Sequence, residues 1–358
     1  MDETPYQRLA QRLDELPNGF PPTPGGAELR LLAYLFTPEE ADLVANLRIT
    51  LETPEQVVER LGGDLKEMRV RLKGMARRGL IHAGRTEAGL GYGLMPFVVG
   101  IYEMQIDRLD AEMARMFEDY YHQAFGLSLA IQPSVHRVIP VGQSLKAGTE
   151  IHPYESAAEI VRSAQAWGVL DCICRKQKAL IGEPCGHPVD ICMALSQQPG
   201  AFDQSQVVRA LTVDEALQTL ERAAKAGLVH SVSNSQHGTG YICNCCTCSC
   251  GILRGIAEFG ILNAVAHSAF VNTVDEERCN ACAACLEGCQ FNALHLELVM
   301  TVDPLHCVGC GVCVQLCPEE ALSLVRRPEK ELTPPPVDDR EWMEVRSAAR
   351  GRRLEDVL

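Results

Sequence analysis

The sequence predicts a multidomain protein of the α+β class, and three observations support this prediction. The chain has 358 residues, which is enough for two or three domains. Signals for helix starts are clear in the N-terminal part, whereas all 17 cysteines follow Asp171. A segment near the C-terminus occurs twice, at a period of 28 residues. We therefore predict an N-terminal domain of helices and a hairpin, a cysteine-rich α/β middle domain, and a duplicated C-terminal domain.

The composition excludes several classes of protein. Lys and Arg total 33 against 47 Asp and Glu, and this acidic balance argues against a general nucleic-acid binder. The longest apolar run, Leu94 to Ile101, is interrupted by Pro96, so no membrane span is expected. The N-terminus lacks the basic-then-apolar pattern of a signal peptide, which predicts a cytoplasmic location. Because cytosolic thiols stay reduced and the cysteine count is odd, we expect metal or iron–sulfur ligation rather than disulfides.

The N-terminal domain is predicted at residues 27–98, after a flexible segment at 1–26. The runs TPEE from Thr37 and TPEQ from Thr53 each supply an N-cap, a Pro in the first turn and a capping-box partner. A third helix begins at Asp64 and ends at Gly79. The run GLIHAGRTEAGLGYGL then predicts a strand, a Gly-rich turn and a second strand. Three helices and a hairpin resemble the winged-helix fold.

The resemblance makes the third helix of this domain the recognition helix. Its basic side chains fall on one side at helical spacing: Lys66, Arg69, Lys73 and Arg77. Such a stripe can bind DNA phosphates or dock a protein. Residues 27–98 carry equal numbers of acidic and basic side chains, so the domain as a whole is neutral. We favour docking of a partner protein and keep DNA binding as the alternative.

The middle domain is predicted at residues 136–270, after a helical linker at 99–135. The linker includes a long helix at roughly 100–125 that joins the domains or makes a dimer contact. Nine cysteines lie in the middle domain: Cys172, Cys174, Cys185, Cys192, Cys243, Cys245, Cys246, Cys248 and Cys250. Cationic neighbours of the first pair, such as Arg175, favour thiolates, which makes small buried hydrophobic side chains a weaker interpretation. His187 is a further candidate ligand.

The five cysteines of the run CNCCTCSC cannot all bind one small cluster. In extended backbone, Cys243 and Cys245 face one way, and Cys246, Cys248 and Cys250 face the other. We therefore expect this run to share ligation with the four earlier cysteines, next to a helix starting near Gly251. Two four-iron clusters with one cysteine left over, one larger cluster, or one cluster plus zinc all fit the count. Residues 223–243 also echo 75–94, which suggests a second, degenerate winged-helix element.

The C-terminal domain, at residues 271–328, carries the duplicated segment. The runs VDEERCNACAACLEGCQFNAL from Val274 and VDPLHCVGCGVCVQLCPEEAL from Val302 each contain C-x2-C-x2-C-x3-C. They closely resemble the bacterial ferredoxin family with two four-iron (4Fe-4S) clusters, over roughly residues 272–326. Paired zinc knuckles fit less well, because zinc sites separate their cysteine pairs by longer loops and often include His.

The resemblance implies a crossed set of ligands, in which the fourth cysteine of each copy binds the other cluster. Cluster one then takes Cys279, Cys282, Cys285 and Cys317. Cluster two takes Cys307, Cys310, Cys313 and Cys289. One departure from the family is Gln290, which stands where Pro is usual and where the second copy has Pro318. The remaining residues, 329–358, are expected to form a charged tail.

The sequence favours a protein that relays single electrons through several 4Fe-4S clusters, as a subunit or adaptor of an oxidoreductase with a redox partner protein. No Gly-rich nucleotide motif and no Ser-His or Cys-His pair appears outside the candidate ligands, so at most an electron-transfer component of an enzyme is expected. The alternative is a redox-sensing transcriptional regulator that binds DNA through the winged helix. A catalytic middle cluster would require an iron with an open coordination site.

Overall fold

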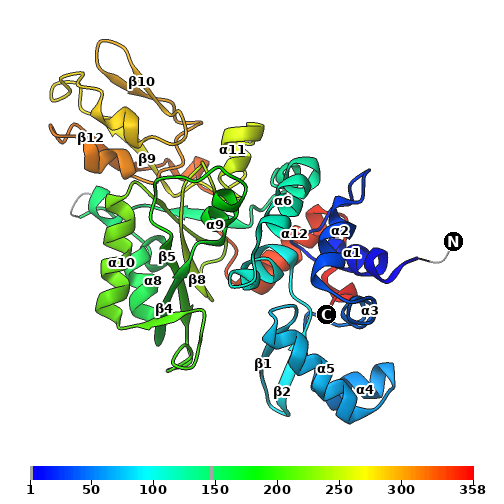
Figure 1. Cartoon of the computed structure of the whole chain (residues 1–358). Helices are drawn as coiled ribbons and strands as arrows, with labels where there is room; N and C mark the ends of the chain where they lie inside the picture. Colours follow the sequence, from blue (N-terminus) through cyan, green and yellow to red (C-terminus); the bar gives the residue numbers. More distant parts are fainter. Residues whose placement is uncertain (1–2, 146–147) are drawn as a thin grey trace. The chain divides into compact units, whose positions relative to one another are not determined.

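The computed structural model describes residues 3–145 and 148–358. The chain divides into two compact units, and the ribbon in Figure 1 shows their elements. The first unit comprises Met1–Ser128, Leu180–Gly182 and Met343–Leu358; the second comprises Leu129–Ala179 and Glu183–Trp342. Helices and several small sheets occur together, as predicted for a multidomain α+β protein. Among the described residues, no helix combines the length and the apolar composition needed to cross a bilayer.

The first unit is mainly helical. Its elements are α1 (Pro5–Glu15), α2 (Ala27–Leu35), α3 (Pro38–Ala45), α4 (Pro54–Leu61), α5 (Leu65–Arg77), β1 (His82–Thr86), β2 (Gly89–Gly93), α6 (Ala111–Tyr120), α7 (Gly126–Ser128) and the end of α12 (Asp339–Ala349). Helices α3 and α4 start at the predicted residues, because Thr37 and Thr53 form complete capping boxes. Helix α5 starts after Asp64, whose carboxylate accepts a hydrogen bond from Glu67 N.

The elements from α3 to β2 follow the order that the winged-helix interpretation requires. Strands β1 and β2 pair in antiparallel fashion, with His82 opposite Gly93. Glu52, just before α4, bridges Tyr92 in β2 and adds one short antiparallel pairing to the hairpin. The hairpin therefore follows α4 and α5 and is tied to the segment that precedes them.

The structure differs from the sequence prediction at both termini and in the linker. Residues 5–15, predicted to be flexible, form α1, because Thr4 makes a capping box and Leu9 and Leu13 are buried. In the predicted charged tail, Leu354 and Val357 are buried within the first unit. The helix predicted from about residue 100 begins only at Ala111, where the carboxylate of the preceding aspartate caps the first turn.

The second unit is built on a six-stranded antiparallel sheet. Its strands are β3 (His136–Ile139), β4 (Ala166–Asp171), β5 (Asp190–Ser196), β6 (Arg209–Leu211), β7 (Val229–Ser233) and β8 (Tyr241–Cys245), in the order β3-β7-β8-β5-β4-β6. Its helices are α8 (Ala157–Ser163), α9 (Ile173–Leu180), α10 (Val213–Lys225) and α11 (Arg254–Phe259). Helix α10 followed by the β7–β8 pair has the same order as α5 followed by β1 and β2.

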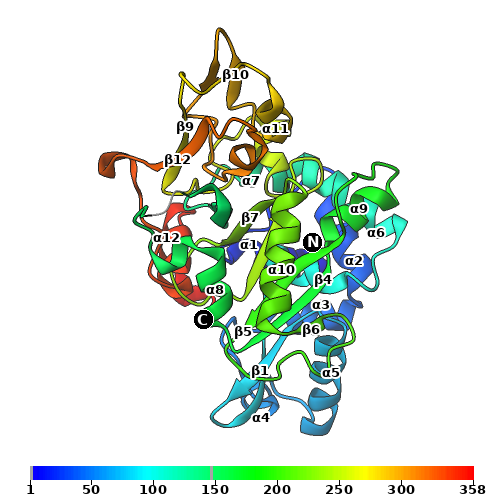
Figure 2. The same ribbon diagram turned by 90° about the vertical axis from the view of Figure 1, so that its left-hand side faces the viewer.

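Helices α8 and α10 cover one face of this sheet (Figures 1 and 2). Ile160 of α8 and Leu220 of α10 pack against Met193 of β5 and Ile242 of β8 in one apolar core. Side chains alternate between the two faces of a strand. The residues next to Met193 and Ile242, which include two cysteines, therefore point to the opposite face.

The C-terminal part of the second unit contains two short antiparallel pairs. Strand β9 (Phe270–Val274) pairs with β12 (Leu322–Arg326), and β10 (Leu294–Leu296) pairs with β11 (Met300–Val302). The β9–β12 pair brings the two ends of the duplicated segment together. One short 3-10 helix in each copy, at Ala284–Gly288 and Val312–Leu316, lies between these strands.

Candidate metal centres

The two copies of the C-terminal repeat curl in the same way. Ala281 and Ala283 have positive φ angles of 58° and 63°, and Gly309 and Gly311, which lie 28 residues later, have φ of 72° and 75°. Left-handed backbone is unfavourable for residues other than glycine. The second copy also has no room for a side chain, because a Cβ at Gly309 would lie 2.1 Å from Phe270 O. Because these left-handed positions recur in both copies, the two cysteine loops curl in the same way.

Each of two cavities in this region is lined by four cysteines. The first cavity has Cys279, Cys282, Cys285 and Cys317 in its wall. The second cavity has Cys289, Cys307, Cys310 and Cys313 in its wall. Each cavity thus combines three thiols of one copy with one thiol of the other, which is the grouping that the ferredoxin resemblance implies. The two 3-10 helices meet at Gly288, where a Cβ would lie 2.4 Å from Leu316 Cδ1.

Backbone and side-chain amides point at the sulfurs of these cavities. Ala293 N donates to Cys289 Sγ at 3.4 Å, and Ala321 N donates to Cys317 Sγ at 3.2 Å, at matching positions of the two copies. Asn272 Nδ2 donates to Cys313 Sγ at 3.2 Å. Burial raises the pKa of Cys310 to about 12, and burial also raises the pKa of Cys285 above its ordinary value. Hydrogen bonds of this kind stabilise thiolates, and the high pKa values mean that a bound cation is needed to keep all thiols ionised.

Six of the middle cysteines form a closed ring of thiols on the sheet face opposite α8 and α10. Cys192 comes from β5, and Cys243 and Cys245 come from β8. The other three lie between β4 and α9, in α9, and in the turn after β8. Each thiol lies close enough to two others to shift their pKa values, in the order Cys172, Cys174, Cys250, Cys245, Cys243, Cys192 and back to Cys172. We call this set the six-thiol ring.

The six-thiol ring cannot ionise as a whole without a positive partner. Hydrogen bonds from Cys174 and Cys192, helped by the charge of Arg175, hold the pKa of Cys172 well below its ordinary value. The hydrogen bond to Cys172 raises the pKa of Cys174 well above its ordinary value, and burial adds to the effect. Hydrogen bonds of Cys243 and Cys250 likewise lower the pKa of Cys245 to about 6, so two thiolates are stabilised at the expense of their neighbours. Iron ions would remove this conflict, so the residues present fit an iron–sulfur cluster.

The remaining three middle cysteines gather with His187 in a separate group. The ligand atoms of Cys185, His187, Cys246 and Cys248 all lie within 4.8 Å of one another. We call this set the Cys3His quartet. Cys248 Sγ lies 3.8 Å from His187 Nδ1. Arg175 Nη2 donates to Cys246 Sγ at 3.5 Å, so this arginine acts on both groups of thiols.

The predicted alternation of the CNCCTCSC run holds for β8 and fails after it. Cys243 and Cys245 share one face and belong to the six-thiol ring. Cys250 joins them, although the pattern placed it with Cys246 and Cys248. The strand ends at Cys245, and Cys250 N donates to Cys246 O at 3.0 Å, so the chain turns back. The helix expected near Gly251 begins at Arg254.

Two polar residues near the six-thiol ring were not singled out in the sequence. Ser231 Oγ lies 3.5 Å from Cys245 Sγ and 3.4 Å from His136 Nδ1. Burial lowers the pKa of His136 to about 4, so its ring is neutral near pH 7. Both residues sit inside strands whose sequences carry no motif. Only the neighbouring positions of β3, β7 and β8 in the sheet bring them to the thiols.

Gln290, the departure from the ferredoxin pattern, contacts the middle domain. Its Oε1 accepts a hydrogen bond from Thr247 N at 2.8 Å, and its Nε2 donates to Gly227 O at 2.5 Å. Thr247 lies between two cysteines of the Cys3His quartet, and Gln290 follows Cys289. A proline at this position could make neither hydrogen bond. The glutamine therefore joins the two cysteine-rich regions.

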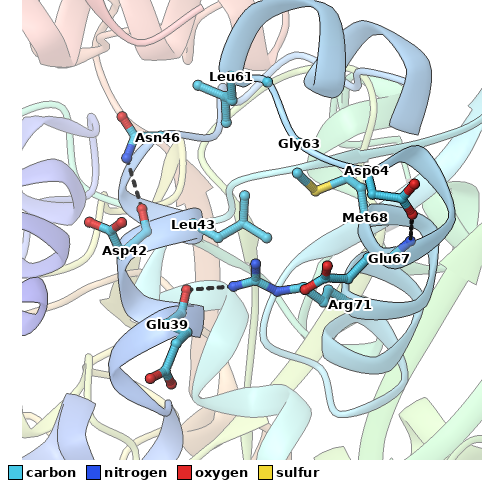
Figure 3. Close-up of a pocket in the computed structure, with 11 residues that line it drawn as sticks. Glu39, Asp42, Leu43, Asn46, Leu61, Gly63, Asp64, Glu67, Met68 and Arg71 are labelled. Carbon is cyan, nitrogen blue, oxygen red and sulfur yellow. Dashed lines mark hydrogen bonds between the residues drawn. The ribbon is translucent and has the colours of Figure 1, made fainter.

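Helix α5 presents the predicted basic stripe beside an acidic pocket. Lys66, Arg69, Lys73 and Arg77 are all exposed. Arg69 forms an ion pair with Glu55. The pocket, lined in part by Glu39, Asp42, Asp64, Glu67 and Arg71, lies between α3 and the start of α5 (Figure 3). These carboxylates would repel nucleic-acid phosphates approaching the first turn of α5.

The comparisons with known proteins concern the second copy of the repeat. A family model described as a 4Fe-4S binding domain matches residues 300–323. No curated protein and no solved structure matches the chain. The matched segment contains Cys307, Cys310, Cys313 and Cys317. This 4Fe-4S binding domain and the 17 cysteines of the chain support iron–sulfur binding.

Proposed function

We propose that this protein carries single electrons through several iron–sulfur clusters, as a subunit or adaptor of an oxidoreductase. The observation that carries the proposal is the pair of cavities, each lined by four thiols drawn from both copies of the repeat. Cys279, Cys282, Cys285 and Cys317 would hold cluster one. Cys307, Cys310, Cys313 and Cys289 would hold cluster two. Bound 4Fe-4S clusters supply one-electron redox chemistry, and the chain supplies thiolates, amide donors to sulfur and burial.

The six-thiol ring is the proposed site of a further iron–sulfur cluster. A 4Fe-4S cluster takes four thiolates, so six convergent thiols favour one cluster larger than a cube. Cys172, Cys245 and Cys250 are buried, and the charge of Arg175 stabilises the Cys172 thiolate. Gln290 holds the segment of cluster two against the segment that follows β8. This contact supports transfer of electrons between the C-terminal clusters and the middle one.

A redox-sensing regulator is the second candidate function. The exposed basic stripe on α5, next to the β1–β2 hairpin, is the observation that favours it. The acidic pocket at the start of α5 and the ion pair of Arg69 favour docking of a partner protein instead. The net charge of −14 also disfavours DNA binding. We therefore place electron transfer first.

Cluster content of the full chain tests the main proposal. Anaerobically purified protein should contain more than the roughly eight irons of two 4Fe-4S clusters, with matching sulfide. Cys174→Ser should lower the iron content to about eight, because it removes one thiol of the six-thiol ring. Gln198→Ala, at an exposed position of the same unit, is the control and should keep the excess iron. Wild-type protein with eight irons or fewer would contradict a cluster in the ring.

The crossed ligation has its own test. Cys289→Ser should damage the cluster held by Cys307, Cys310 and Cys313, because Cys289 lines their cavity. EPR of the reduced protein should show the other cluster unchanged. When a one-electron acceptor reoxidises this variant, the signal change that comes from the C-terminal clusters should be about half of the wild-type change. Loss of the cluster at Cys279 with the other intact would rule out the crossed arrangement.

A further inference from the structure

We propose that the Cys3His quartet, formed by Cys185, His187, Cys246 and Cys248, binds one zinc ion that is separate from the iron–sulfur clusters. This zinc is structural and takes no part in electron transfer. The inference concerns ligands outside the six-thiol ring and outside both C-terminal cavities. It therefore does not depend on the proposed electron relay.

The size of the quartet selects a single ion. Its four ligand atoms lie within 4.8 Å of one another, and Cys248 Sγ and His187 Nδ1 are 3.8 Å apart. Tetrahedral zinc has Zn–S bonds of about 2.3 Å and Zn–N bonds of about 2.0–2.1 Å, which places ligand atoms about 3.5–3.8 Å apart. Thiolates around a four-iron cube must lie farther apart, because the irons and sulfides occupy the space between them. The quartet is thus small enough for one metal ion and too small for a cube.

The ligand types select zinc among the common ions. Three thiolates and one imidazole form one of the standard four-coordinate sets of structural zinc sites. Magnesium and calcium prefer oxygen ligands, which this group does not offer. All four positions come from protein side chains, so no position is left for a substrate or water. A closed site of this kind is structural rather than catalytic.

Neighbouring residues supply the hydrogen bonds that such a site requires. Three thiolates and one Zn²⁺ leave a net negative charge, which the guanidinium of Arg175 offsets with its hydrogen bond to Cys246 Sγ at 3.5 Å. Ser249 Oγ donates to Cys185 Sγ at 3.4 Å. Hydrogen bonds from outside the coordination sphere orient ligands and tune affinity. Arg175 and Ser249 are both buried, so their donors are fixed in place.

The position of the quartet gives zinc a role in assembling the six-thiol ring. Cys185 and His187 lie in the loop between α9 and β5, which separates two ring cysteines, Cys174 and Cys192. Cys246 and Cys248 lie in the turn between two other ring cysteines. A metal that joins these segments closes a large loop, and because its site forms only in the folded chain, the binding free energy stabilises the fold. We expect zinc to hold both segments in register for the ring.

Metal analysis and zinc K-edge X-ray absorption of the full-length protein test the proposal, because this edge ignores iron. Protein produced with zinc and iron present should contain about one zinc per chain, bound by three sulfurs and one nitrogen. Cys248→Ser should reduce zinc to less than about a tenth of the wild-type content. His187→Cys should keep the zinc and change its shell to four sulfurs, which shows direct ligation even if Cys248→Ser folds poorly.

The matched control separates the zinc site from the clusters. Cys174→Ser removes a thiol of the six-thiol ring and should lower iron while zinc stays at about one per chain. Wild-type protein without zinc, or zinc that keeps its nitrogen ligand in His187→Cys, would overturn the inference. A chain with zinc but without iron in the ring would leave the inference standing and would count against the middle cluster of the proposed function.

Discussion

At the scale of single residues, the departure at Gln290 has a structural explanation. Ferredoxins of the resembled family usually have proline after the fourth cysteine, and the second copy has Pro318. The side chain of Gln290 instead makes hydrogen bonds to Thr247 and Gly227 that a proline could not make. The substitution therefore marks a contact between two parts of the same unit. A side chain that breaks a family pattern is a useful indicator of such a contact.

We predict that Gln290→Ala loosens this contact without removing a thiol. Loss of the hydrogen bonds to Thr247 and Gly227 should cost about 1–3 kcal/mol of local stability. Hydrogen exchange of the Thr247 amide, which donates to Gln290 Oε1, should become faster. Gln198→Ala, at an exposed position of the same unit, should leave this exchange unchanged. Unaltered protection at Thr247 in Gln290→Ala would show that the contact does not form in solution.

Two buried histidines predict acid sensitivity of the second unit. Burial lowers the pKa of His136 and of His230 to about 4, whereas the unfolded chain has a pKa near 6.5. Below about pH 6.5 the unfolded state binds protons that the folded state does not, so stability falls as the pH drops toward 4. Between about pH 6.5 and 4, each histidine lowers the free energy of unfolding by on the order of 3 kcal/mol.

The apparent melting temperature between pH 7.5 and 5 measures this effect. We expect it to fall steadily below pH 6.5 in the wild-type protein. His136→Phe should make the decline shallower, because one proton-binding group of the unfolded state is lost. His295→Gln, at an exposed position, is the control and should follow the wild-type curve. Parallel curves for His136→Phe and wild type would show that the lowered pKa of His136 does not cause the acid sensitivity.

At the scale of elements, the charges on and around helix α5 bear on whether this helix docks a protein or binds DNA. Its four basic side chains are exposed, but one of them is paired with Glu55 and its first turn adjoins the acidic pocket. A helix that enters the major groove places its N-terminal residues near the bases. Carboxylates at that end oppose such an approach. The order of elements around α5 agrees with the winged-helix interpretation, whereas the nearby carboxylates disfavour DNA binding.

We predict that the full-length protein shows no saturable binding to a random DNA duplex at about 0.15 M salt. Fluorescence anisotropy over a salt series provides the measurement, because a true binder weakens steeply as salt increases. The variant with Lys66, Lys73 and Arg77 replaced by Glu serves as the comparison and should give the same flat signal. Saturable binding that disappears in this variant would favour the regulator.

At the scale of the whole molecule, the proposed electron transfer predicts that the net charge of −14 influences the rate of encounter with a redox partner. Oppositely charged proteins associate faster at low salt, and screening removes this advantage. The acidic chain should therefore exchange electrons readily with a partner that has a basic surface. Like-charged acceptors should meet it more slowly until salt screens the repulsion.

The salt dependence of reoxidation checks this prediction. The rate with a basic acceptor such as mitochondrial cytochrome c should fall as salt rises from about 0.01 to 0.5 M. The rate with ferricyanide, a small anion, should rise over the same range. Stopped-flow absorbance of the reduced protein follows both reactions. Equal salt responses for the two acceptors would show that the net charge does not control the encounter.

The sequence alone determined the features that depend on local chemistry. The capping boxes at Thr37 and Thr53 predicted two helix starts, because the bonds join residues three positions apart. The 28-residue period predicted the C-terminal repeat, and the family match at residues 300–323 agrees with the cysteine spacing. Nine middle cysteines and His187 were recognised as candidate ligands in the same way. Their residue types and spacing carried that information.

Only the tertiary structure decided how these ligands are divided. Cys172 and Cys192 meet because β4 pairs with β5, and Cys250 reaches them because the chain turns after Cys246. The structure also buried Leu9 and Val357 in segments that sequence reasoning left unstructured. Such contacts join residues far apart in the chain and depend on which strands pair and which apolar faces pack. Periodicity and motif spacing describe neighbours in sequence, so they cannot specify the six-thiol ring or the Cys3His quartet.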